Sequence, residues 1–224
     1  MEKVNIREWN TNQKNLFASL SNEKTFNNGI SLLIKMHSSI HDKTVYKNTT
    51  ETIFNKLLEN LKDETYKIIS KKETSILWNI WHITRIEDIV SNLLIGNKET
   101  IFNTELQKKL NIKIKDTGNV MTYSEIEMFN KNISIKELLK YRNNIGKSTK
   151  KIIEKLKNID MKRKVEKSQL ENIKLNGGIV NDSMWLLDFW GKKNILGLIM
   201  MPITRHQIIH INDCFNIKLK YNKK

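Results

Sequence analysis

Apolar residues recur at steps of three and four along most of the chain, which is the spacing of one face of an α-helix. The clearest stripe begins after Thr74 or Ser75, which are good N-cap residues, and stops at Gly96, which suits a helix end. Its apolar members are Ile76, Leu77, Ile80, Ile83, Ile86, Val90, Leu93 and Leu94. The pattern predicts a long helix over about residues 75–95.

Similar stripes at residues 26–37 and 53–61 predict two more helices. Another begins at Ser134, where Glu137 three residues later would complete a capping box. The tail helix is expected to begin around Pro202, because proline suits the first helical position.

The segment 96–133 departs from this regular pattern and reads as an excursion with a short helical patch. A second capping box, Thr122 to Glu125, predicts one more short helix within it. Alternation typical of strands never lasts more than a few residues. We therefore expect an all-α protein, a four-helix bundle with additional short helices. The expected single domain spans 1–224, with a core of about 25–222.

The formal charge of +15 raises the possibility of a nucleic-acid partner. Only five of the 39 basic residues are arginines, so 34 are lysines, and these are spread over almost every segment. DNA-reading proteins favour arginine for bidentate contacts, so we do not expect nucleic acid as a partner. The periodic apolar stripes also exclude a disordered chain.

A single cysteine, Cys214, excludes an internal disulfide and any cysteine-cluster metal site. No apolar run approaches the ~20 residues of a membrane span, and Met1 to Leu16 contains no apolar signal-peptide core. The expected location is the cytoplasm, with no membrane partner.

Three histidines carry the candidate chemistry. His206 and His210 stand four residues apart in the predicted tail helix, so both imidazoles project from one face. His82 shares a side of its helix with Ile86 and Ile89, so we expect it to point into the bundle. A lone inward histidine is more often a hydrogen-bonded core residue, but a pair beside a third favours metal ligation. We predict that His82, His206 and His210 bind one divalent metal ion.

Three neutral nitrogen ligands would leave coordination positions open for water or substrate, as in catalytic sites. Zinc, nickel and ferrous iron all suit such ligands, and the spacing does not choose among them. Two other metal scaffolds are excluded. A His-Glu-x-x-His protease helix needs a glutamate base where this chain has Gln207, and di-iron bundles need Glu-x-x-His, which is absent.

The sequence does not identify a catalytic residue. Arg85 and His37 are the pocket candidates, because Arg85 follows His82 by one turn and His37 continues an apolar stripe. The roles of His41 and Cys214 are left open, whereas Arg142 interrupts an apolar stripe and is expected to be buried and paired.

Three blocks of the chain resemble the DinB-like (YfiT-like) superfamily of metal-dependent bundle proteins. They are Ile80-Trp81-His82-Ile83-Thr84-Arg85-Ile86-Glu87-Asp88, the pair Tyr141-Arg142, and Pro202-Ile203-Thr204-Arg205-His206-Gln207-Ile208-Ile209-His210-Ile211. The resemblance implies a four-helix bundle whose metal ligands are His82, His206 and His210.

The resemblance also implies a function class. Relatives include enzymes that transfer a low-molecular-weight thiol to an electrophile, in stress response or detoxification, and members that have lost the metal. The expected partners are a small thiol and a small-molecule electrophile. A basic stress protein that binds nucleic acid, a metal-dependent hydrolase and a homodimeric assembly stay open as alternatives.

Overall fold

The computed structural model describes residues 4–222, and within this range it contains helices and no β-strand. The prediction of an all-α protein is therefore confirmed. The α-helices are α1 (Ile6–Leu20), α2 (Phe26–Ser39), α3 (Lys43–Tyr46), α4 (Ile53–Leu58), α5 (Asp63–Lys67), α6 (Ile76–Glu87), α7 (Thr104–Leu110), α8 (Tyr123–Asn132), α9 (Ile135–Ile153), α10 (Lys167–Leu175), α11 (Trp185–Gly191), α12 (Ile195–Leu198) and α13 (His206–Tyr221). Among the described residues, three short 3-10 helices occupy Glu23–Thr25, Asn158–Lys162 and Asn181–Ser183.

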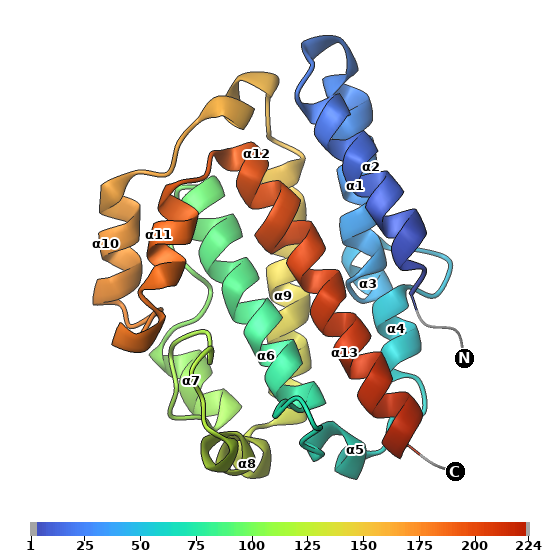
Figure 1. The fold of residues 1–224 in the computed structure, drawn as a ribbon, viewed down its shortest axis with the longest axis vertical. Helices are drawn as coiled ribbons and strands as arrows, with labels where there is room; N and C mark the ends of the chain where they lie inside the picture. Colours follow the sequence, from blue (N-terminus) through green and yellow to red (C-terminus); the bar gives the residue numbers. More distant parts are fainter. Residues whose placement is uncertain (1–3, 223–224) are drawn as a thin grey trace.

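The helix α6 lies at the centre of the bundle, with α9 and α13 packed along it (Figure 1). The helix α2 packs against α9, and α1 lies along α2 as an additional helix. At the opposite side of the molecule lie α10 and α11, while α7 and α8 cover one end (Figure 1). No helix within residues 4–222 is both long and apolar enough to cross a membrane.

Two stretches of π-helix extend the helices that carry the candidate ligands. Asp88–Ile95 continues α6 without a break, and Ile199–Arg205 joins α12 to α13. Pro202 lies inside the second stretch, so the prediction that it begins the tail helix was wrong. A proline lacks the N–H that an α-helix needs, and the local wider π-turn accommodates it within a longer helix.

The predicted helix ends are mostly observed. The Ser75 side chain caps α6, and Thr122 and Glu125 form a complete capping box on α8. At α9 only half of the predicted box is present, because Ser134 caps the helix while Glu137 pairs with Lys140.

The helix ends near Gly96 as predicted, but the residue with the left-handed conformation is the next one. Gly96 keeps a right-handed φ of −84°, and the left-handed residue that leaves the helix is Asn97.

Every residue of α6 and of the following π-helical stretch is buried. A buried polar group without a hydrogen bond costs free energy, so the polar side chains of this helix need partners. Asp88 is the fullest example, since its carboxylate accepts from the backbone N–H groups of Ile101 and Phe102, both at 2.9 Å. It also accepts from the Tyr141 hydroxyl at 2.6 Å. Asp88 thus ties α6 to α9 and to the start of the 96–133 excursion.

Replacing Asp88 by alanine should destabilise the fold by about 3–5 kcal/mol, because it strands two backbone donors and a buried hydroxyl. Urea denaturation followed by circular dichroism measures this change. The matched control is Glu105→Ala, which removes a carboxylate from the exposed ion pair with Lys109 and should leave the unfolding midpoint unchanged. An Asp88→Ala midpoint equal to that of the control would contradict the assignment.

Candidate metal centre

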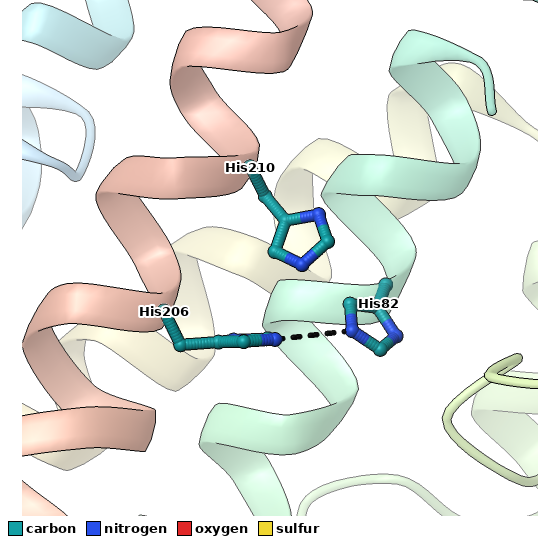
Figure 2. Close-up of side chains that lie close together, drawn as sticks. All are labelled: His82, His206 and His210. Atoms are coloured by element: carbon teal, nitrogen blue, oxygen red, sulfur yellow. Dashed lines mark hydrogen bonds between the residues drawn. The ribbon is translucent and has the colours of Figure 1, made fainter. Parts of the chain in front are cut away.

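The side chains of His82, His206 and His210 converge in the interior of the bundle (Figure 2). His82 comes from α6, whereas His206 and His210 occupy the first and fifth positions of α13. One ring nitrogen from each lies within 4.8 Å of the others, and the Nε2 atoms of His82 and His206 are 3.1 Å apart. Two nitrogens bound to one ion at ~2.0–2.1 Å would be about 2.9–3.4 Å apart, so this separation fits a shared ion.

Hydrogen bonds behind the rings fix which nitrogen of two ligands carries the proton. The Nδ1–H of His82 donates to the Thr117 carbonyl at 2.7 Å. The Nδ1–H of His210 donates to Asn79 Oδ1 at 2.7 Å, and the amide of Asn79 is oriented by its own bond to the Ser75 carbonyl. Both histidines therefore direct a bare Nε2 lone pair inward, which is the arrangement that a metal ion requires.

The third histidine is held differently. His206 Nδ1 is buried without a hydrogen-bond partner among the described residues. The Nε2–H of His206 donates to the Nε2 lone pair of His82, and a bound ion would displace this proton. The residues present therefore fit a metal ion.

Burial keeps all three imidazoles uncharged at neutral pH. It lowers the pKa of His82 to about 3, with the neighbouring His210 adding to the effect. It lowers the pKa of His210 to about 4, with a contribution from Lys72, and that of His206 well below its usual value. Neutral imidazoles are the form that binds metal.

The three candidate ligands differ in their exposure to solvent. His82 is buried and its ring stacks on Trp78, with centroids 4.6 Å apart and planes inclined by 9°. His206 and His210 are only partly buried. The exposed part of the triad therefore lies on α13.

A second group could also hold a metal ion by geometry alone, and it contains His37, His41 and Glu87. The Nε2–H groups of both histidines donate to the Glu87 carboxylate, at 2.8 Å from His37 and 3.1 Å from His41. Arg142 donates to the same carboxylate at 2.9 Å, and Tyr46 donates to His37 Nδ1 at 2.7 Å. None of the three candidate ligands, nor Arg142, is exposed to solvent.

The charge balance of this second group argues against a metal ion there. Burial works to raise the pKa of Glu87, but His41 and Arg142 hold it well below its usual range. The carboxylate is thus ionised and already paired with the guanidinium of Arg142. A divalent ion would place two more positive charges beside a buried arginine, at a large electrostatic cost. The triad of histidines is the better candidate metal centre.

The structure separates the two pocket candidates from the triad. His37 belongs to the Glu87 group. Arg85 is buried, donates from Nε to the Lys115 carbonyl at 2.8 Å, and lies over the Phe102 ring at 4.6 Å. A role for either in substrate binding stays a prediction.

Cys214 lies in neither group of candidate ligands. Its thiol is fully buried, and burial raises the pKa of the thiol. It is therefore neutral at physiological pH.

Reasoning from sequence missed the groups that orient the ligands. Asn79 stands three residues before His82, so helical spacing places it on the same face of the helix and could have identified it. Thr117 acts through a backbone carbonyl in a loop, and no residue type announces such a contact. The partnership of Glu87 with both His37 and His41 was also not predicted.

An all-helical bundle with an inward histidine triad joining two central helices defines a class of candidate metal-binding bundle proteins. A model of the DinB superfamily matches residues 48–181, more than half of the chain, and the chain belongs to that superfamily. The matched segment includes His82 but ends before α13, which carries the other two histidines. No curated protein and no solved structure matches the chain.

If the triad is the metal centre, the purified protein should bind about one divalent ion per chain. His206→Ala should weaken binding by orders of magnitude in a competition titration with a chromogenic chelator. His41→Gln, which alters only the second group, is the matched control and should retain wild-type affinity. If His41→Gln lost the metal while His206→Ala retained it, the second group and not the triad would be the metal centre.

The second group should make stability depend on pH. Burial, reinforced by Arg142, lowers the pKa of His41 to about 3, against about 6.5 in an unfolded chain. Between these values the unfolded chain binds a proton that the folded chain does not, so the free energy of unfolding decreases as pH falls below about 6.5. His41→Gln keeps a donor for Glu87 but cannot titrate. The free energy of unfolding of this variant should therefore decrease less steeply between pH 6.5 and 5 than that of the wild type. Urea titrations of metal-free protein test this, and equal slopes would refute it.

Proposed function

We propose that this chain is a metal-dependent enzyme that transfers a low-molecular-weight thiol to an electrophilic small molecule. The observation that carries the proposal is the composition of the candidate ligand set, which consists of three neutral imidazoles and no acidic residue. Such ligands leave the full charge of a divalent ion uncompensated. An anionic fourth ligand is then strongly favoured, and a thiolate is a soft, anionic ligand that suits zinc or a similar ion.

A divalent ion held by the triad would supply Lewis acidity, lowering the pKa of a thiol so that it reacts as a thiolate at neutral pH. The protein's own contribution is to keep the ligands neutral and aimed. The Thr117 carbonyl and Asn79 Oδ1 retain the Nδ1 protons of His82 and His210, so neither ring can turn a proton toward the ion. Trp78, stacked on His82, excludes water from the α6 side.

Access supports an external thiol rather than the protein's own. His206 and His210 are partly exposed, so the α13 side is where a small molecule would enter. Cys214 is fully buried and outside the candidate ligand group. We therefore infer that the fourth ligand is a thiol from solution.

Cobalt-loaded protein tests the proposal through its visible and near-ultraviolet spectrum. Addition of a small thiol from a panel should produce a sulfur-to-metal charge-transfer band, and the corresponding alcohol should not. Cys214→Ser, which removes the protein's only thiol, should give the same band at the same thiol concentration. When a model electrophile is then added, the cobalt-loaded protein should consume the thiol faster than the metal-free protein does.

Two results would contradict thiol transfer. A band present before any thiol is added, and abolished by Cys214→Ser, would mean that the protein's own cysteine closes the site. Bound cobalt that no thiol perturbs would favour the hydrolase alternative, which hydrolysis of ester and amide substrates by the loaded protein would then establish.

A further inference from the structure

Three side chains along one face of α6 donate to carbonyls of one short segment of the 96–133 excursion. Trp78 Nε1 donates to the Gly118 carbonyl at 3.0 Å, and His82 Nδ1 to the Thr117 carbonyl at 2.7 Å. One turn later, Arg85 Nε donates to the Lys115 carbonyl at 2.8 Å. The segment 115–118, called the strap below, thus runs antiparallel to α6 and covers the side of His82 that faces away from α13.

The strap is shaped by its own residues. The Asp116 carboxylate accepts from the Gly118 N–H at 2.7 Å, and the Thr117 hydroxyl donates to Asn119 Oδ1 at 2.6 Å. Gly118 has a φ of +76°, in the left-handed region that favours glycine. A Cβ at this position would lie 3.1 Å from Trp78 Nε1. The turn from Asp116 to Gly118 therefore determines where the Thr117 carbonyl points.

We propose that the strap is a positioning element of the metal centre and that Asp116 is its positioning residue. The inference rests on the proposed metal site. Of the three candidate ligands, His82 is the most deeply buried, and the Thr117 carbonyl is the acceptor for its Nδ1. The hydrogen bond made by one ring nitrogen decides whether the other is protonated or free to bind metal. When the Asp116 turn relaxes, the carbonyl moves away and His82 loses the constraint that keeps Nε2 bare.

The location of the turn explains why its effect should be specific. Asp116 touches no candidate ligand and is itself partly exposed, so its removal leaves no cavity in the core. Its effect on the metal passes through the Thr117 carbonyl alone. Through this turn, the excursion acts on the metal centre.

Cobalt titrations of four variants test the proposal. Asp116→Ala should weaken cobalt binding about tenfold, the lower end of the range for loss of a partner behind a metal ligand. Asp116→Asn retains an acceptor oxygen for the Gly118 N–H and should restore wild-type affinity. Lys115→Ala lies in the strap but changes only a side chain, since that residue contributes its carbonyl. Asn103→Ala removes the N-cap of α7 elsewhere in the excursion. Both controls should bind cobalt as the wild type does.

A second readout separates positioning from general loosening. In metal-free, nitrogen-15-labelled protein, the hydrogen-bonded Nδ1–H of His82 should give a protected proton resonance, assigned by its loss in His82→Gln. Asp116→Ala should lose or shift this resonance, and Asp116→Asn should keep it.

The outcomes divide as follows. Wild-type affinity together with an unchanged His82 resonance in Asp116→Ala would overturn the proposal. Equal weakening by Asp116→Ala and Asn103→Ala would also overturn it, because the effect would then come from the stability of the excursion. If the wild-type protein binds no metal, the proposed function fails, while the resonance comparison still decides whether Asp116 positions His82.

Discussion

Burial of α6 on all sides is the constraint on which the rest of this structure depends. A helix with no solvent-facing side can carry polar residues only if each one meets a partner inside the protein. This helix and its π-helical extension carry Asn79, His82, Arg85, Glu87 and Asp88, and each of them does. Their partners come from α2, α9, α13 and the excursion, so the same bonds that satisfy α6 also fix the register of its neighbours.

The polar residues of α6 divide into two regions with opposite electrostatic character. Toward α13 lies the histidine triad, which is neutral and contains no countercharge. Toward α2 and α9 lies the Glu87 group, where an ionised carboxylate is balanced by Arg142 and accepts hydrogen bonds from His37 and His41. The first region could accept a cation, and the second already contains one, the guanidinium of Arg142. Similar residue types thus lead to different chemistry because a single arginine is present in one region only.

Much of this organisation follows from local sequence. The helix caps at Ser75 and Thr122 are read directly from residue type and spacing, and the four-residue step between His206 and His210 predicts a shared face. Burial and pairing of Arg142 follow from its place in an apolar stripe. Pro202 misleads because a π-helical stretch, which depends on tertiary packing, accommodates a residue that usually marks a helix start. The role of the Thr117 carbonyl is beyond prediction from residue type, since every residue offers a carbonyl and only the path of the loop selects one.

The contact between His82 and His206 joins positions 124 residues apart in the chain. An ion shared by these residues would be a reversible cross-link that closes a loop of more than half the protein. An unfolded chain does not hold the three imidazoles together, so a bound ion would stabilise the folded state by binding to it alone. Occupancy of the site would then also slow unfolding, because α6 and α13 could separate only after the ion had left. In a chain without disulfides, the availability of metal would set how long each folded molecule persists.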